Sequence, residues 1–289
     1  MRFSKLLLVL LFILLFTAGD YYDVVIDSSQ SFDMVIDGSQ SYDIVIMNWF
    51  ESSWKTDNTG TSNNNQITLP LYDPGGAFDS NYDFTVDWGD GSSDIVTAWD
   101  QAEKTHTYGS AGTYTVRIKG TIKGFWFNNS GDEEKLLTIS KWGVLDLSTD
   151  AAFYGCANLD VTATDAPIIS TTDLSSMFRD CSVLTSIGDA SGWDVSSVTT
   201  MNYMFYSASA FNQDIGGWVV AALTNATDML IGATDFTNAN YSNLLIGWQA
   251  TAHTAASTLD ANAKYNVAGG VARGLLSGEG WTITDGGAE

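Results

Sequence analysis

The sequence Ser176-Met177-Phe178-Arg179-Asp180-Cys181-Ser182-Val183-Leu184 is the clearest of four similar segments between residues 149 and 250. In each segment a large apolar residue is followed, three and six residues later, by a small residue and by a second large apolar residue. The units are Phe153, Cys156 and Leu159; Phe178, Cys181 and Leu184; Phe205, Ala208 and Phe211; and Leu230, Ala233 and Phe236. Their first residues follow one another at intervals of 25, 27 and 25 residues. A nearly constant period of this length predicts coils that stack as a solenoid.

The segment before these repeats, residues 48–148, has the pattern of an all-β domain. Residues 84–88 and 112–118 alternate apolar and polar side chains, as strands with one buried face do. Turn residues such as Gly89-Asp90-Gly91-Ser92-Ser93 recur between the strands, at the spacing of about 8–12 residues that is typical of a sandwich. We therefore predict a mainly β protein in which a β-sandwich precedes the solenoid.

Residues 20–47 contain a ten-residue repeat of their own. The units begin at Tyr22, Phe32 and Tyr42, and Ser, Gly or Gln turn residues separate their short β-branched runs. This pattern predicts strand, turn and strand. Three short strands do not bury a core of their own. The segment therefore packs on the next domain, acts as a spacer, or pairs with another copy of the chain through its open strand edges.

The first 19 residues have the pattern of an export signal. Arg2 and Lys5 precede an unbroken apolar run at residues 6–16, and small residues follow at positions 17–19. The apolar run has eleven residues, fewer than the roughly 20 that a membrane-spanning helix needs. We expect cleavage after this segment, no stable membrane span in the mature chain, and a secreted or cell-surface location.

The charge of the chain excludes several partners. There are 34 Asp and Glu against 12 Lys and Arg, which gives a formal net charge of −22. Such a surface repels phosphate groups, so binding to nucleic acid or to anionic lipid by charge is excluded. Two Cys and two His are too few for a disulfide framework or a Cys/His zinc site. The chain also lacks the glycine motifs that bind nucleotides, and we expect no cofactor.

Cys156 and Cys181 occupy the same column of adjacent predicted coils. Neighbouring strands lie about 4.8 Å apart, which is compatible with a disulfide, and the exported compartment permits one. The same column continues as Ala208 and Ala233, which indicates instead that packing requires a small side chain there. A disulfide and a pair of buried thiols therefore both fit the sequence. A nucleophilic role is not expected, because no His is placed to activate either thiol.

Acidic residues around the turn at residues 89–93 are the one metal candidate, and a weak one. Asp87, Asp90 and Asp94 offer the oxygen ligands that Ca²⁺ prefers. The turn lacks an Asp-x-Asp-x-Asp-Gly loop, and capping of the turn is the simpler interpretation. Because carboxylates are so frequent, pairs at a separation suited to acid–base catalysis arise by chance. We predict no catalytic residue and no enzyme activity.

Polar and aromatic side chains between the apolar columns are the candidates for ligand binding. Tyrosine is among the residues that most often anchor contacts with partners. We expect exposure and a role in recognition for Tyr203, Tyr206, Asn212, Gln213 and Asp214.

Several segments resemble known families. Residues 176–184 resemble BspA-type leucine-rich-repeat surface proteins, as do Trp193-Asp194-Val195-Ser196-Ser197-Val198-Thr199-Thr200-Met201 and Phe211-Asn212-Gln213-Asp214-Ile215. Residues 241–248 and 280–287 are similar to the C-terminal cap of that family. The order Val86-Asp87-Trp88-Gly89-Asp90-Gly91, His106-Thr107-Tyr108 and Ala111-Gly112-Thr113-Tyr114-Thr115-Val116 resembles PKD domains, which are Ig-like sandwiches that usually have Phe where Trp88 stands. The resemblance covers about residues 50–287.

The patterns of the first 47 residues predict a signal peptide (1–19) and β-strand repeats (20–47), which lie outside the resemblance. For the rest, the resemblance implies an Ig/PKD-like β-sandwich (48–148), a short leucine-rich-repeat solenoid (149–250) and a small α/β C-terminal cap (251–289). The family implies an exported adhesin or recognition protein that binds a protein or glycan on another surface through its repeats. One alternative is a structural subunit of an extracellular assembly that polymerises through residues 20–47. Another is an accessory module of a polysaccharide-degrading enzyme, because PKD-like modules often accompany such enzymes.

Overall fold

The computed structural model describes residues 22–27, 30–34, 48–73, 82–251, 253 and 257–289. The chain divides into two compact units, residues 1–48 and 49–289. In the first unit, strands β1 (Tyr22–Asp27) and β2 (Gln30–Met34) pair antiparallel and overlap the first two ten-residue repeats. The third repeat and the predicted export signal lie outside the described residues. In the described part of the chain, no helix is long and apolar enough to cross a membrane.

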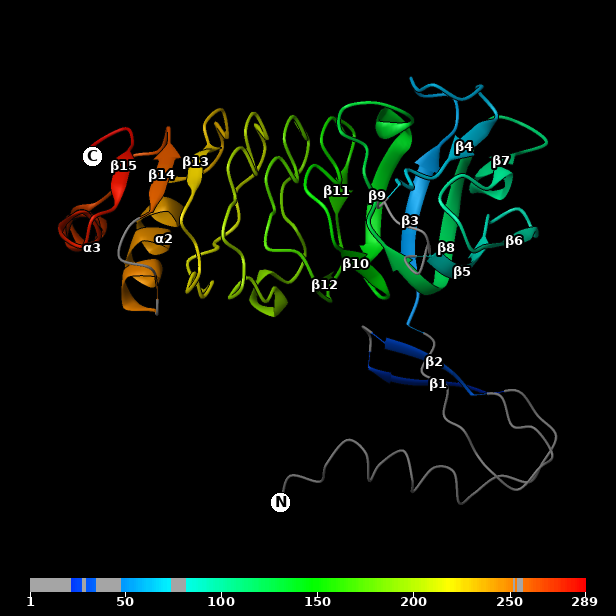
Figure 1. Ribbon diagram of the computed structural model, residues 1–289, viewed down its shortest axis with the longest axis horizontal. Coiled ribbons are helices and arrows are strands. Elements are labelled where there is room, and N and C mark those ends of the chain that lie inside the picture. Colours follow the sequence, from blue (N-terminus) through cyan, green and yellow to red (C-terminus); the bar gives the residue numbers. More distant parts are fainter. Residues whose placement is uncertain (1–21, 28–29, 35–47, 74–81, 252, 254–256) are drawn as a thin grey trace, which may run out of the picture. The chain divides into compact units, whose positions relative to one another are not determined.

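The second unit is mainly β, as the sequence predicts, and its first part is an eight-stranded sheet (Figure 1). Two further strands, β4 (Gln66–Thr68) and β7 (Thr105–Thr107), form a separate antiparallel pair. The spatial order in the large sheet is β11 (Asp160–Val161), β9 (Leu136–Lys141), β3 (Phe50–Lys55), β8 (Thr113–Lys123), β10 (Leu145–Leu147) and β12 (Ile168–Ile169). Two more strands branch from β8: β5 (Tyr82–Asp87) pairs with β8, and β6 (Ser93–Val96) pairs with β5.

The strands of this sheet bury alternate side chains. Strand β3 buries Phe50, Ser52 and Trp54, and β5 buries Tyr82, Phe84 and Val86. This period of two follows from the pleat, which turns successive side chains to opposite faces. Short 3-10 turns lie at Ala102–Lys104, Glu133–Lys135 and Ala190–Gly192.

The sheet continues into the coils without a break in its hydrogen bonding. Strand β9 pairs in parallel with β11, and β10 pairs in parallel with β12. The segment before residue 149 already has the position of a coil, because the backbone N–H of Phe127 donates to the carbonyl oxygen of Ala152 (3.1 Å). The large sheet therefore closes one end of the coil stack and shields its apolar columns from water.

Backbone hydrogen bonds join each coil to the next. The N–H groups of Phe153, Phe178 and Phe205 donate to the carbonyl oxygens of Met177, Met204 and Met229, at 3.0, 2.9 and 2.9 Å. Isolated parallel bridges link Asp173 with Thr200 and Thr200 with Asn225. Because this register repeats with the sequence period, equivalent residues of successive coils lie side by side.

Two columns of left-handed residues shape each coil. The first column is Ala151, Ser176, Tyr203 and Asp228, with φ of 50°, 54°, 58° and 55°. The second is Gly155, Asp180, Ser207 and Gly232, with φ of 89°, 60°, 56° and 82°. Residues other than glycine rarely adopt positive φ. Its recurrence at the same two positions indicates that the bonding between coils imposes this geometry.

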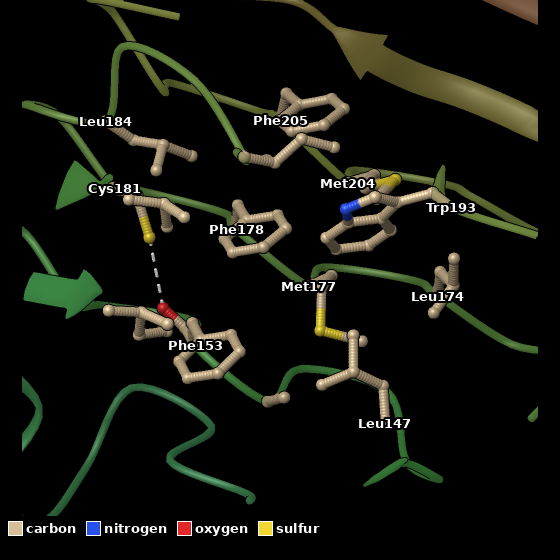
Figure 2. Packing of buried hydrophobic residues seen from close by; sticks show 14 of the residues in the cluster. Leu147, Phe153, Leu174, Met177, Phe178, Cys181, Leu184, Trp193, Met204 and Phe205 are labelled. Carbon is tan, nitrogen blue, oxygen red and sulfur yellow. Dashed lines mark hydrogen bonds between the residues drawn. The ribbon is translucent and has the colours of Figure 1, made fainter. Parts of the chain in front are cut away.

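The apolar columns form the core of the coil region (Figure 2). The Phe178 ring stacks between Phe153 (centroids 5.5 Å apart, interplanar angle 8°) and Phe205 (5.8 Å, 6°). Trp193 packs against the same ring at 6.1 Å. These side chains are almost completely buried, and aromatic rings contribute large buried areas to a core.

The C-terminal region adds two helices to a small parallel sheet. The sheet has the order β13 (Ala226–Leu230), β14 (Thr258–Ala261) and β15 (Thr282–Thr284). Helices α2 (Asn238–Ala250) and α3 (Val267–Gly278) begin after Thr237 and Asn266, whose side chains accept hydrogen bonds from backbone N–H groups of the first turn. Helix α2 buries Tyr241, Leu244, Leu245 and Trp248.

A histidine–glutamate pair connects the end of α2 to the end of α3 and makes this region sensitive to pH. His253 donates through Nδ1 to the carbonyl oxygen of Thr251 (2.8 Å), and its Nε2 pairs with a carboxylate oxygen of Glu279. Burial alone would lower the pKa of His253, but the hydrogen bonds to Glu279 and Thr251 raise it above its ordinary value. The pair therefore favours the folded state fully at pH values below the unfolded pKa of about 6.5. This contribution is lost as pH rises through the folded pKa.

We expect Glu279→Gln to lower the melting temperature near pH 5.5 and to have little effect near pH 9, because His253 is then neutral in both states. Thermal unfolding of both proteins across this range measures the effect, and NMR titration of His253 measures its pKa directly. Glu103→Gln, at an exposed glutamate, is the control. An equal difference in melting temperature at both pH values would contradict the prediction.

Candidate functional site

One column on the outer side of the coils brings together aromatic residues and an arginine. The backbone N–H of Gly155 donates to the carbonyl oxygen of Arg179 (2.9 Å), and the backbone N–H of Asp180 donates to the carbonyl oxygen of Tyr206 (2.8 Å). These two bonds place Tyr154, Arg179 and Tyr206 at equivalent positions of three successive coils. Because each such position is preceded and followed by left-handed residues in its own coil, the same backbone geometry presents all three side chains.

The guanidinium of Arg179 lies among three tyrosine rings. Its central carbon is 4.9 Å from the ring centroid of Tyr154, 5.2 Å from that of Tyr203 and 5.1 Å from that of Tyr206. The rings of Tyr203 and Tyr206 meet edge to face at 5.6 Å. A cation within about 6 Å of an aromatic face is attracted by the ring quadrupole. We call Tyr154, Arg179, Tyr203 and Tyr206 the arginine–tyrosine cluster.

The N–H donors of Arg179 have no hydrogen-bond acceptor among the described residues. Its Nε is buried and makes no hydrogen bond. Asp180 forms an ion pair with it, with Oδ2 3.8 Å from Nε, a distance too long for a hydrogen bond. The side chain is nevertheless 32% exposed. The cluster therefore surrounds the guanidinium with aromatic rings, and its two Nη groups are the donors left for a ligand because Nε is buried.

A carboxylate orients one of the tyrosines. The hydroxyl of Tyr203 hydrogen-bonds to Asp228, and this bond raises the pKa of Tyr203. Asp228 occupies the position equivalent to Tyr203 in the next coil, as the left-handed column shows.

The predicted binding residues separate into two groups. Tyr203 and Tyr206 belong to the arginine–tyrosine cluster. The side chains of the other three form hydrogen bonds to neighbouring coils and the following helix. Gln213 accepts a hydrogen bond from Ile187 N and donates one to the carbonyl oxygen of Gly188. Asn212 accepts from Thr237 N and Asn240 Nδ2. Asp214 accepts from Gly216 N and Asn243 Nδ2. These partners lie outside the cluster; the bond between Gly216 and Asp214 is local, and the others join this coil to the preceding coil or to Thr237 and helix α2.

Arg179 and Tyr154 were not predicted from the sequence as binding residues, although the sequence contains an indication for Arg179. Arg179 is the only Lys or Arg between Lys141 and Lys264. A single base in such an acidic region indicates a specific task. Tyr154 carries no comparable signal, because its relation to Arg179 arises only when the coils stack.

Both cysteines are free and buried. The Sγ of Cys181 donates to the carbonyl oxygen of Phe153 (3.1 Å), as Figure 2 shows. Burial raises the pKa of both thiols, which disfavours the reactive thiolate. The structure thus has the packed-thiol arrangement, and a disulfide between Cys156 and Cys181 remains a prediction for the exported protein.

The three aspartates proposed for calcium each have a different partner. Asp87 accepts from Gly89 N (2.9 Å), and Asp94 accepts from the indole of Trp88 (2.9 Å). Asp90 accepts from Ser92 and pairs with His106 (2.8 Å); the Ser92 hydroxyl, followed by His106, lowers the pKa of Asp90 to about 2. Within the described residues, no group of three or more His, Cys, Asp or Glu side chains is arranged to hold a metal ion.

The coil region matches a known family model. Residues 126–265 are similar to the family described as "Mycoplasma protein of unknown function, DUF285". The match relates the chain to surface proteins in general terms. It spans all four coils and the whole arginine–tyrosine cluster. No curated protein and no solved structure is significantly similar to the chain.

Proposed function

We propose that this chain is an exported, non-catalytic recognition protein that binds its ligand at the arginine–tyrosine cluster. The observation that carries the proposal is a guanidinium held between tyrosine rings with no acceptor for its donors among the described residues. Tyrosine and arginine are the residues most enriched, with tryptophan, at the energetic centres of binding surfaces. The similarity of residues 126–265 to a surface-protein family supports the proposed location.

The architecture that presents this site is proposed to be a short leucine-rich-repeat solenoid behind a PKD-like sandwich. Hydrogen bonds between equivalent residues of successive coils support the first assignment. The stack of Trp88 on His106 (5.0 Å), with Tyr108 at the edge of the imidazole (4.5 Å), supports the second. These residues come from the segments that resemble PKD domains. The proposed parts keep the boundaries 48–148, 149–250 and 251–289.

A non-catalytic role agrees with the surroundings of the reactive groups. The thiols of Cys156 and Cys181 are fully buried, with raised pKa values. Asp87, Asp90 and Asp94 are each engaged by a hydrogen bond within the domain. Self-assembly through residues 20–47 is the alternative; it rests on β1 and β2, whose only partners among the described residues are each other, and it remains a prediction.

Binding to arrayed glycans and proteins tests the proposal, with the exported chain as the probe. We expect the wild-type chain to bind at least one arrayed ligand and Tyr206→Ala to weaken that binding by about tenfold or more, as truncation of a central aromatic anchor does. Tyr265→Ala is the matched control, because Tyr265 also lies beneath an arginine, Arg273 at 5.6 Å, but outside the cluster. Absence of any ligand, or equal binding by wild type and Tyr206→Ala, would contradict the proposal.

A further inference from the structure

The geometry of the arginine–tyrosine cluster points to the chemical class of its ligand. We propose that it binds the carboxylate of an acidic sugar, such as a uronic or sialic acid residue of a glycan. This inference rests on the proposed function and narrows it to one ligand class.

The carboxylate is inferred from the state of the guanidinium. The ring centroids of Tyr154, Tyr203 and Tyr206 lie 4.9–5.2 Å from its central carbon. Its Nε is buried, so a ligand approaches the edge formed by the two Nη groups. Along that edge arginine presents paired N–H donors that match the two oxygens of a carboxylate. The neighbouring Asp180 does not reach hydrogen-bond distance, since its Oδ2 is 3.8 Å from Nε. The exposed part of this side chain, which is 32% exposed in all, thus offers the two Nη groups to an anionic acceptor.

A single carboxylate fits this site better than a polyanion does. Arg179 is the only Lys or Arg between Lys141 and Lys264 in the sequence, and Asp180 and Asp228 lie close to the cluster. One negative charge is matched by Arg179, but further charges would meet these aspartates in a chain of net charge −22. Repulsion between like charges therefore disfavours sulfated or phosphorylated polymers. We expect only a weak dependence of binding on salt.

The surroundings of the guanidinium favour a sugar over an acidic peptide. Around it are phenolic hydroxyls and carboxylates, which exchange hydrogen bonds with sugar hydroxyls. A peptide partner would need an apolar, desolvated centre for its anchoring side chains. The cluster instead combines a charged group with three phenols and with the nearby carboxylates of Asp180 and Asp228.

Titration of the exported chain with small probes tests this inference. The probes are the methyl glycosides of glucuronic acid and of N-acetylneuraminic acid, each compared with its methyl ester, which keeps the ring and removes the charge. We expect at least one acid to bind and its ester to bind about tenfold more weakly or not at all, because ester oxygens accept weaker hydrogen bonds from arginine. This comparison uses the wild-type protein and needs no variant to fold.

Arg179→Lys keeps the charge and removes the paired donors. We expect it to weaken binding of the acid by about tenfold while the melting temperature stays close to that of the wild type. Arg117→Lys is the matched control, since Arg117 is 46% exposed and pairs with Glu51 on the large sheet. Equal binding of acid and ester, unchanged binding by Arg179→Lys, or binding of an acetylated glutamate peptide with no binding of either acid would overturn the inference.

These outcomes separate the inference from the proposed function. If the array identifies a neutral glycan or a protein whose binding is lost in Tyr206→Ala, the recognition site stands and the acidic-sugar class is wrong. If no arrayed ligand binds, or binding survives in Tyr206→Ala, the recognition site itself is wrong.

Discussion

Asp132→Asn is expected to lower the free energy of unfolding by about 3–5 kcal/mol, because it leaves a buried lysine without its counterion. The side chains of Asp132 and Lys135 are both completely buried, with Lys135 Nζ 3.6 Å from Asp132 Oδ1. Breaking a buried pair by removing one charge is strongly destabilising, whereas the intact pair need not stabilise the fold relative to an apolar one. The single substitution is therefore expected to have a large effect, whatever the intact pair contributes to the free energy of unfolding.

The hydrogen bonds of the aspartate add to this effect. Both carboxylate oxygens accept: Oδ1 from Ser62 N (3.0 Å), and Oδ2 from Ser62 Oγ (2.6 Å) and Thr68 N (2.8 Å). An asparagine side chain has only one acceptor oxygen, and its NH₂ group would face one of the donors on Ser62 or Thr68. Lys135 in turn donates to Ser62, Asn63 and Gln66. The pair thus holds residues 62–68 against the beginning of β9, where the large sheet leads to the coils.

Urea unfolding followed by circular dichroism measures this prediction. Asp57→Asn is the matched control, because the Lys55–Asp57 pair (2.7 Å) is 41% exposed on both sides and exposed pairs contribute little to stability. Adding Lys135→Met to Asp132→Asn should recover part of the lost stability, since no unpaired charge then remains. A loss for Asp132→Asn no larger than that for Asp57→Asn would contradict the prediction.

Phe178→Ala is expected to destabilise the second unit by about 3–5 kcal/mol, the range for removal of a buried aromatic side chain. Phe178 is fully buried, and its ring is stacked between Phe153 and Phe205. Its loss would leave a cavity in the middle of the coil stack. Because each coil is stabilised mainly by its neighbours, the coils on the two sides of this cavity would also be coupled less tightly.

The matched control for Phe178→Ala is Val183→Ala in the same coil, where Val183 is 45% exposed. We expect this control to change stability by less than about 0.5 kcal/mol. Urea unfolding followed by tryptophan fluorescence measures both, and a broader transition in Phe178→Ala would report the weakened coupling. Similar midpoints for the two variants would show that the Phe178 ring is not a principal contact between coils.

The apolar columns could be predicted from the sequence because a constant period fixes the register of stacked coils. Phe153, Phe178 and Phe205 stack as their spacing indicates, and Phe211 lies parallel to Phe236 at 5.8 Å. The left-handed backbone at Ser176 and Tyr203 could not be predicted in this way. Neither residue favours positive φ by itself, so the conformation depends on hydrogen bonds to coils that are distant in the sequence.

The candidate site was found only in part. Tyr203 and Tyr206 were predicted because they lie in one unit between two apolar columns. A binding role for Asn212 and Gln213 stays a prediction; in the structure their amide groups form hydrogen bonds to backbone groups of other segments, as polar backbone requires. No sequence pattern distinguishes an amide that binds a ligand from one that joins two coils.

The sequence by itself determined the β class of this protein and the order of its apolar columns, because the spacing of apolar residues is visible in the sequence without the fold. Only the tertiary structure decided which polar residues meet. Arg179 joins Tyr154 and Tyr206 across 25 and 27 residues of sequence, and Asp132 and Lys135 are buried although isolated charges favour water. Both outcomes depend on desolvation and on partners that stacking brings into contact, and neither is encoded in the local pattern.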